Sequence, residues 1–523
     1  MNNGLKRLPT GIQTFAEMRE GDYLYVDKTA LVYRLTSEHK YVFLSRPRRF
    51  GKSLLCSTLK SYFEGRRDLF EGLAVMDLET EWRKHPVLLI SLASMKGGTP
   101  QEFNDKIDVQ LRRYEEQFGI EKDSNMPGAR LQKLIEQAPA KTGEKAVLII
   151  DEYDAPLLTV LQEPERLKDM RTTVRSLFGC LKDCDPYLRF VFITGISKFS
   201  QVSIFSELNN LDKITMIPRY SAICGFTQNE LETQMRPWVE HLATDLKLTV
   251  EETLLQLKQN YDGYHFTRDL TDIYNPYSLL QAFKWSEMKD YWFDTGTSSA
   301  LINMLQGLGT RVVEFDDGCE CNERQFDAPT EKLITPVPFL YQSGYLTIKA
   351  FDAETGLYVL KYPNREVRNG MMEELVPFYL EDYSESAGSV VANVYRAIRR
   401  DDLNQAFQTL KVYLASIPYA ENATSEGHYQ TMLYVVFSLL GRYVQMEVRT
   451  AKGRIDMVLC TKTDIYVMEL KIDSSASEAL GQIDQKGYML PYTADGRRLH
   501  KVGIAFSTRE RTLSEWKVVE AKE

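Results

Sequence analysis

Gly51, Lys52 and Ser53 are the first residues in the chain whose order and spacing could do chemistry. They end the loop RPRRFGKS (46–53), which follows the apolar run YVFLS (41–45) and precedes a stretch with helical periodicity. A strand, a loop that ends in Gly-Lys-Ser and a helix, in that order, are typical of a phosphate-binding loop. In such a loop the glycine permits a tight turn and the amides at the helix start face the phosphates. The lysine contacts the β- and γ-phosphates, and the serine hydroxyl binds Mg²⁺.

The loop departs from the usual pattern at Arg46, where that pattern has glycine. The alternative is therefore a strand-to-helix turn that contains Gly-Lys-Ser by chance. Arg46, Arg48 and Arg49 raise the local positive charge, which suits phosphate binding and equally suits a solvated loop. We assign the loop and the residue after it to nucleotide binding: Arg46, Pro47, Arg48, Arg49, Phe50, Gly51, Lys52, Ser53 and Leu54.

A second apolar run, VLII (147–150), ends in Asp151 and Glu152. In a doubly wound sheet, a carboxylate at the carboxyl end of a strand lies where ligands bind. We predict that Asp151 and Ser53 hold a magnesium ion and that Glu152 polarises the attacking water. The alternative is that Asp151 caps a helix after the strand, a common role of aspartate.

Two further apolar runs complete the expected sheet, HPVLLISLA (85–93) and RFVFITG (189–195). Strands that alternate with helical stretches predict a parallel sheet with right-handed crossovers. Thr194, near the end of the last run, is interpreted equally well as a sensor of the γ-phosphate and as an ordinary strand-end hydroxyl.

A second group of chemical residues lies in the tail, in the runs GRIDMVLC (453–460) and IYVMELK (465–471). The polar residues between them predict a β-hairpin. If the turn centres on Lys462-Thr463, the numbers of cross-strand partners sum to about 925. Asp456 then lies opposite Glu469.

Asp456, Glu469 and Lys471 are therefore expected to converge on one face of the hairpin, since residues two apart on a strand share a face. The two carboxylates supply hard oxygen ligands for Mg²⁺. Lys471 would orient or help deprotonate a metal-bound water and stabilise charge on a phosphoryl group. The alternative is an exposed hairpin stabilised by a charge pair.

Helical segments flank this hairpin at 426–443 and 476–492. Glu426, at the start of the first, could add a carboxylate. In the second, Gln482 and Lys486 have i, i+4 spacing, and either could contact a phosphate backbone. For each of these residues the alternative is a solvated position on a helix.

Composition limits the function classes. The 523 residues include 64 Lys and Arg and 73 Asp and Glu, so the net charge is 64 − 73 = −9, which excludes a general nucleic-acid coat. From residue 416 onward there are 14 basic and 14 acidic residues, so the tail is neutral.

No run of about 18 apolar residues occurs, and we expect a cytoplasmic protein without a membrane segment. Seven scattered cysteines suit reduced thiols.

Through these motifs and a few further segments, the chain resembles a known family. The amino-terminal part resembles the AAA-ATPase-like domain of bacterial proteins through YVDKT, SRPRRFGKS, VLIIDEYDAPL and FITGISKFSQVSIFSELNNL. The tail resembles the accompanying PD-(D/E)XK nuclease-superfamily domain through GRIDMVL, VMELK and GQIDQKGY. In that family arginine in place of the first loop glycine is usual. The resemblance covers nearly the whole chain.

This resemblance implies ATP binding at Gly51, Lys52, Ser53, Asp151 and Glu152. For the tail it implies a metal-dependent phosphodiesterase centre at Asp456, Glu469 and Lys471, with Glu426 and Gln482 as supporting candidates. The cofactors expected are ATP and Mg²⁺, with Mn²⁺ as an option at the nuclease-like site. The partners expected are a nucleic acid, with DNA favoured, and a second copy of the chain.

The expected fold class is α/β multidomain: a P-loop NTPase parallel sheet with a helical lid and a winged-helix-like middle region, then an α/β restriction-endonuclease-like domain. The predicted domains are 1–227 (AAA-ATPase-like), 228–300 (helical lid), 301–375 (winged-helix-like), 376–415 (helical linker) and 416–523 (nuclease-like). Within the middle region, 331–365 predicts a helix end and two strands, and 316–329 predicts a loop.

Three functions follow from this organisation. In the first, nucleotide binding or hydrolysis at the amino-terminal site regulates a metal-dependent nuclease in the tail. In the second, the chain is a nucleotide-dependent switch or scaffold whose tail only binds a partner or nucleic acid. In the third, the ATPase alone is the active half.

Overall fold

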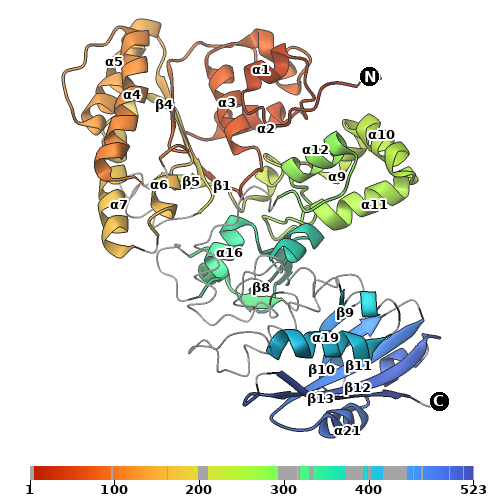
Figure 1. Ribbon diagram of the computed structural model, residues 1–523. Helices are drawn as coiled ribbons and strands as arrows, with labels where there is room; N and C mark the ends of the chain where they lie inside the picture. The colour runs from red at the N-terminus through yellow and green to blue at the C-terminus, as the bar shows by residue number, and fades with distance from the viewer. Residues whose placement is uncertain are drawn as a thin grey trace. The chain divides into compact units, whose positions relative to one another are not determined.

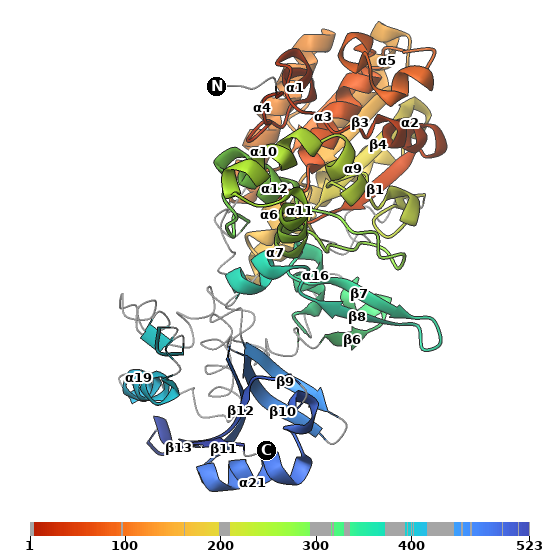
Figure 2. The same ribbon diagram turned by 90° about the vertical axis from the view of Figure 1, so that its right-hand side faces the viewer.

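The computed structural model of the chain forms two compact units (Figures 1 and 2). One consists of Met1–Leu308 and Cys319–Val367, the other of Gly309–Gly318 and Arg368–Glu523. The structure describes residues 5–95, 98–161, 163–197, 210–292, 315, 318–328, 335–371, 393–394, 396–398, 400, 402–415, 444–450, 453–460, 463–493, 495–510 and 512–521.

The first unit is built on a five-stranded parallel sheet with the order β2-β3-β4-β1-β5. The four apolar runs predicted as strands are confirmed, and a two-residue strand joins the edge beside β1. The strands are β1 (Tyr41–Ser45), β2 (Val87–Ser91), β3 (Ala146–Asp151), β4 (Leu188–Gly195) and β5 (Asp212–Lys213).

Helices cover both faces of this sheet, which explains why its four longer strands are apolar along most of their length. The side chains of α4, α5 and α7 share one buried core with alternate residues of β1 to β4. Helix α3 contacts the sheet through β2, β3 and β4, and α1 packs on α3 (Figure 1). These helices are α1 (Phe15–Glu20), α2 (Thr29–Glu38), α3 (Lys52–Phe63), α4 (Pro100–Phe118), α5 (Pro127–Thr142), α6 (Ala155–Leu158) and α7 (Pro164–Phe178).

A helical region follows the sheet, as the sequence predicted. Its helices share a separate apolar core to which Leu24 and Val26 also contribute. Two of them begin with a capping box, in which a threonine and a glutamate three residues later bond to each other's main-chain amides. The helices are α9 (Gln228–Thr233), α10 (Arg236–Leu246), α11 (Val250–Tyr261) and α12 (Pro276–Trp285).

The last part of the first unit is a three-stranded antiparallel sheet, with short helices between its first and second strands in the chain (Figure 2). The predicted helix end and two strands correspond to α16 (Val337–Ser343), β7 (Thr347–Asp352) and β8 (Leu357–Lys361). The loop predicted at 316–329 is wrong in part, because β6 (Cys319–Cys321) pairs with β8 and α15 (Glu323–Phe326) follows it. Phe326 is fully buried against Tyr341 and Tyr358, which holds this polar segment in place.

The second unit is a mixed five-stranded sheet with the order β13-β12-β11-β10-β9. Strands β11 and β12 are parallel and the other pairs are antiparallel. Helix α21 contacts β11 and β12, and α19 contacts β13. The elements are α19 (Leu403–Ala415), β9 (Val444–Thr450), β10 (Gly453–Cys460), β11 (Asp464–Ile472), α21 (Ala476–Lys486), β12 (Arg498–Ser507) and β13 (Thr512–Glu520).

Among the residues that the structure describes, no helix combines the length and the apolar character needed to cross a membrane. All seven cysteines are free thiols, as their scattered positions predicted.

Candidate functional site

The phosphate loop connects β1 to α3 without any regular structure between Ser45 and Lys52. Its backbone is left-handed at two positions, with φ of 67° at Arg49 and 87° at Gly51. A Cβ atom at Gly51 would meet nothing within 4 Å, so the backbone conformation, and not crowding, is what favours glycine there. The loop therefore turns sharply into the amino end of α3, where free amides favour anions.

Arg46 begins this loop but does not reach the cavity beside it. It is 1% exposed, and its guanidinium donates to the carbonyl oxygens of Ser45 (3.0 Å), Thr215 (2.9 Å) and Tyr220 (3.1 Å). It also lies 4.1 Å from the centre of the Phe266 ring. Burial lowers the pKa of Arg46 to about 10. Arg46 thus ties the loop to two neighbouring segments, and the structure does not bring it to a phosphate position.

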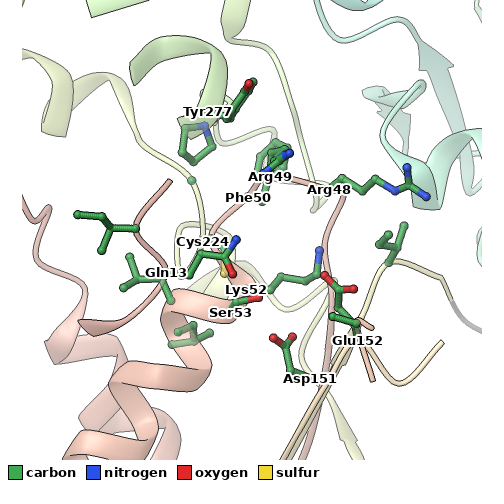
Figure 3. A pocket seen from close by; sticks show the side chains of 18 of the residues that line it. Gln13, Arg48, Arg49, Phe50, Lys52, Ser53, Asp151, Glu152, Cys224 and Tyr277 are labelled. Atoms are coloured by element: carbon green, nitrogen blue, oxygen red, sulfur yellow. The ribbon is translucent and has the colours of Figure 1, made fainter. Parts of the chain in front are cut away.

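The rest of the loop lines a cavity of about 780 Å³ (Figure 3). The residues from Arg48 to Leu54 border it, as do Asp151 and Glu152, whereas Pro47 is buried outside it. Phe50 anchors the loop through edge-to-face contacts with Tyr264 and Phe266, and Arg49 stacks on Tyr277 at 4.8 Å. The loop is therefore held by aromatic packing while its polar end borders the cavity.

Lys52 is buried at the floor of this cavity, and burial lowers its pKa. Its ammonium group donates to the carbonyl oxygens of Arg46 (3.0 Å) and Pro47 (2.9 Å), within the same loop. The carboxylates of Glu152 and Asp151 lie close enough to favour its charged form, and Figure 3 shows all three side chains reaching into the cavity. An ammonium group and two carboxyl groups therefore lie together beside the loop.

Asp151, at the end of β3, has the character of a metal ligand. Burial raises its pKa, and the Ser53 hydroxyl and Lys52 act in the opposite direction. Its Oδ1 atom is buried and has no hydrogen-bond partner among the described residues. An unpartnered carboxylate oxygen beside a serine hydroxyl fits a hard divalent ion such as Mg²⁺.

Glu152 follows with a left-handed backbone, φ 53°. A non-glycine residue in this region is strained by about 1–3 kcal/mol, and such strain is concentrated at functional sites. The turn places Glu152 in the cavity wall next to Asp151, where the predicted water-polarising carboxylate must be.

Thr194 lies in β4, between the strands that carry the loop and Asp151. Its hydroxyl donates to the Leu44 carbonyl at 2.8 Å, the side chain is fully buried, and it does not line the cavity. The geometry therefore favours a strand-end hydroxyl over a sensor of the γ-phosphate.

Asp154 is a cavity residue to which we assigned no role from the sequence, although it lies within the quoted motif VLIIDEYDAPL. Its Oδ2 atom accepts from the amides of Ile196 (3.0 Å) and Ser197 (2.6 Å) and from the Ser197 hydroxyl (2.7 Å). A Cβ atom at Gly195 would come within 2.4 Å of Asp154 Oδ1. Asp154 therefore fixes the end of β4 against the turn after β3.

Lys28, in the quoted motif YVDKT, also lines the cavity without having been predicted. Its ammonium group lies 2.5 Å from Glu230 Oε1, and Glu230 in turn caps α9 through the Thr227 amide. This partly buried pair joins the sheet part of the unit to the helical region. The signal available in the sequence was the place of Lys28 within the quoted motif YVDKT.

The second group of predicted residues lies on β10 and β11. The observed pairs run from Met457 with Met468 to Cys460 with Ile465, so partner numbers sum to 457 + 468 = 925, as predicted. The Leu470 amide donates to Asp456 Oδ2 at 2.7 Å, which draws the Asp456 carboxylate towards β11.

Glu469, Lys471 and Gln482 form a connected set. The Gln482 amide donates to Glu469 Oε1 and its oxygen accepts from Lys471 at 2.5 Å, while the Lys471 ammonium lies 3.9 Å from Glu469 Oε1. Glu469 is 3% exposed, and its Oε2 atom has no hydrogen-bond partner in the described part of the chain. Burial and the charge of Asp456 raise the pKa of Glu469 to about 7.

These residues fit a divalent cation, which would stabilise two neighbouring acids of which one is buried. Among the described residues, no group of three or more His, Cys, Asp and Glu side chains is placed to hold a metal ion. The acidic ligands that the described part of this hairpin offers are therefore the pair Asp456 and Glu469. Glu426 lies outside the described residues. Lys486 is exposed near the end of α21.

The fold and these geometries define the class of protein: an α/β ATPase-like unit with a phosphate loop, in one chain with a second, nuclease-like α/β unit. A family model described as "Predicted AAA-ATPase" matches residues 9–205, and a PD-(D/E)XK nuclease superfamily model matches residues 424–516. Domains of these types generally use a nucleotide and a divalent metal ion.

A relative from Azotobacter chroococcum mcd 1, described as "Uncharacterized protein in vnfD 5'region", is 37% identical to the chain over 520 residues. That match spans 97% of this chain and 98% of the relative. The chain therefore belongs to the family of AAA-ATPase-like proteins that carry a PD-(D/E)XK nuclease-superfamily domain at the carboxyl end.

Proposed function

We propose that the chain binds and hydrolyses ATP with Mg²⁺ in its first unit and uses this cycle to control a metal-dependent nuclease, acting on DNA, in its second unit. The observation that carries the proposal is that one chain contains two separate sets of residues suited to phosphate oxygens. The first consists of the phosphate loop with Lys52 and Asp151. The second consists of the facing acids Asp456 and Glu469 with Lys471.

In the first unit, the amides at the start of α3 and the Lys52 ammonium would hold the β- and γ-phosphates. Lys52 now donates to two carbonyl oxygens of its own loop, and phosphate oxygens are stronger acceptors for an ammonium group. Ser53 and Asp151 would hold Mg²⁺, and Glu152 would orient the attacking water. The 780 Å³ cavity is large enough for a nucleotide.

In the second unit, Asp456 and Glu469 would hold Mg²⁺ or Mn²⁺, and the bound ion would lower the pKa of a water to make the nucleophile. Gln482 bonds both Glu469 and Lys471, so it would fix the distance between the acid that holds the ion and the cation that faces the phosphoryl group. An equal number of acidic and basic residues from 416 onward lets this part of the chain approach a polyanion.

The second candidate is a nucleotide-dependent switch or scaffold whose tail binds a partner or nucleic acid without cleaving it. It is favoured by the position of Lys28 and Glu230, which couple the cavity to the helical region and would transmit nucleotide binding as a change of conformation or assembly.

Parallel assays of ATP hydrolysis and DNA cleavage on the full chain separate these candidates. We expect Lys52→Ala to abolish ATP hydrolysis and any effect of ATP on cleavage. We expect Asp456→Ala to abolish cleavage while ATP hydrolysis survives. ATP hydrolysis without cleavage of any nucleic acid, in any nucleotide state, would support the switch and contradict the nuclease.

A further inference from the structure

The cavity beside the phosphate loop extends to a wall formed near the amino end of the chain. Residues 9–13 border it, and Figure 3 shows the Gln13 side chain reaching into it. This wall lies at least 40 residues before Ser53 in the sequence and contributes no charged side chain to the cavity. A neutral wall of this kind suits the uncharged part of a ligand.

A tight turn shapes the wall. The Ile12 amide donates to the Pro9 carbonyl at 3.2 Å, and Gly11 has a φ of 89°. A positive φ at the third residue of such a turn is typical of type II and favours glycine. The main chain just before Gln13 is therefore set by local sequence.

The wall is also attached to the helix that begins at Lys52. The Phe15 amide donates to the Ser57 hydroxyl at 2.9 Å, and the Phe15 ring is fully buried against Phe70. Ser57 lies one helical turn beyond Ser53 on α3. Gln13, two residues before Phe15, is thus held beside the helix that carries the phosphate-binding residues.

The carboxamide of Gln13 has its donor and acceptor available. It is exposed to the cavity and takes part in no hydrogen bond with any residue that the structure describes. A glutamine amide offers one acceptor and a donor group in a fixed planar arrangement. Gln13 can therefore contact the edge of a planar ligand with two hydrogen bonds.

Another wall of the cavity is apolar and aromatic. It includes Ile223, Phe226, Tyr277 and Leu280. Gly225, between the first two, has a φ of 88°, and a Cβ atom there would come within 2.3 Å of a methyl carbon of Ile273. The glycine therefore allows the main chain to lie close to Ile273. The apolar and aromatic side chains of this wall suit the face of a nucleobase.

We propose that Gln13 is the residue that selects adenine in this site, an inference that rests on the proposed nucleotide binding. Its oxygen would accept from the N6 amine of adenine and its NH₂ group would donate to N7, a pairing that glutamine makes with adenine elsewhere. Guanine presents two acceptors, O6 and N7, along the same edge, so the Gln13 oxygen would be left without a donor.

The test compares the affinities of the full chain for ATP and GTP by titration calorimetry with Mg²⁺. We expect the wild type to prefer ATP by roughly 5- to 150-fold, the discrimination of one good bidentate contact. Gln13→Ala should bring the two affinities within about threefold of each other. Gln13→Arg should favour GTP over ATP, because arginine donates to both O6 and N7 of guanine.

Thr14→Ala is the matched control, since Thr14 is the exposed neighbour of Gln13 and does not line the cavity. It should keep the wild-type preference. Equal affinities of the wild type for ATP and GTP, or an unchanged ratio in both Gln13 variants, would overturn the inference while leaving nucleotide binding intact. A wild type that binds neither nucleotide would overturn the proposed function as well.

Discussion

Asp456 and Glu469 are the residues next to the last observed pair of an antiparallel ladder, Met457 with Met468, and their numbers give the same sum, 925, as the pairs of that ladder. The Leu470 amide donates to Asp456 Oδ2 at 2.7 Å, which holds the Asp456 carboxylate beside β11. The charge of Asp456 contributes to raising the pKa of Glu469 to about 7, after the larger contribution of burial. Two acids in this relation are costly to ionise together and are stabilised by a divalent cation between them.

Gln482 should govern how well this pair holds a metal ion. It donates to Glu469 and accepts from Lys471, so its removal frees both side chains to move. We expect Gln482→Ala to weaken Mn²⁺ affinity by about 10- to 100-fold, the usual effect of losing a group that orients a ligand. Titration calorimetry with Mn²⁺ measures this.

Gln485→Ala is the control for that measurement, since Gln485 is an exposed residue of the same helix. It should bind Mn²⁺ as the wild type does. Equal loss of affinity in both variants would show that the helix, and not the contact to Glu469, is responsible.

Lys52 should contribute strongly to ATP affinity, although it is already hydrogen-bonded within its loop. A charge-assisted bond contributes about 1.5–3 kcal/mol, so we expect Lys52→Ala to weaken ATP binding by roughly 10- to 100-fold. Lys60→Ala, on the same helix and paired with Glu64, should leave the affinity unchanged. A fluorescent ATP analogue reports both, and unaltered binding by Lys52→Ala would contradict the assigned phosphate site.

Arg46 should contribute to the stability of the fold, because its guanidinium donates to main-chain carbonyl oxygens and does not line the cavity. Its removal leaves buried acceptors without partners, at a cost of about 1–3 kcal/mol each. We expect Arg46→Ala to lower the free energy of unfolding by about 3 kcal/mol or more. Arg48→Ala, at an exposed position, should change it by less than about 0.5 kcal/mol.

Denaturant unfolding of the two arginine variants shows whether Arg46 stabilises the fold or contacts the phosphates of the nucleotide. If Arg46→Ala kept wild-type stability and lost only nucleotide affinity, Arg46 would be a phosphate ligand after all.

Asp262 should make stability depend on pH. It is 1% exposed, neither carboxylate oxygen has a hydrogen-bond partner among the described residues, and burial raises its pKa to about 7. The unfolded chain therefore loses this proton near pH 4, before the folded chain does near pH 7. Between these values the folded state binds more protons, so the free energy of unfolding falls as pH rises and stays low above about pH 7.

The variant Asp262→Asn has no carboxyl group at this position. Comparing it with the wild type therefore separates the contribution of Asp262 to the pH dependence of stability from the contributions of other groups. The carboxyl group faces Lys258, at 3.9 Å, and lies within electrostatic range of Lys349 and Asp272. We expect the variant to gain stability over the wild type as pH rises from 5 to 8, by about 2.7 kcal/mol, because the pKa of about 7 lies two pH units above the starting pH. Urea unfolding at several pH values measures the difference, and a difference independent of pH would show that Asp262 is ionised throughout.

The strands and the hairpin register could be predicted from the sequence because they depend on local patterns. A short apolar run such as 147–150 is typical of a buried strand, and β3 extends it by one residue at each end. The alternation around Glu469 indicates which residues share its face. The position of Asp456 followed from the turn alone. These features need no knowledge of distant parts of the chain.

The roles of Arg46 and Thr194 could not be predicted because their partners are distant or lie on another strand. Arg46 bonds to Thr215 and Tyr220, about 170 residues away, and Thr194 bonds to Leu44. No local pattern reveals which face of a strand end is turned towards a cavity. The segment containing Cys321 was missed as a strand for the same reason, since its partner β8 follows later in the chain.

The most direct test of the account is the rate of DNA cleavage by the full chain with Mg²⁺ or Mn²⁺, compared between the wild type and Asp456→Ala in the presence of ATP. We expect cleavage to require the metal ion and to be at least 100-fold slower in the variant, a loss of about 2.7 kcal/mol of transition-state stabilisation. Equal rates for the two proteins, or no cleavage by the wild type in any nucleotide state, would contradict it.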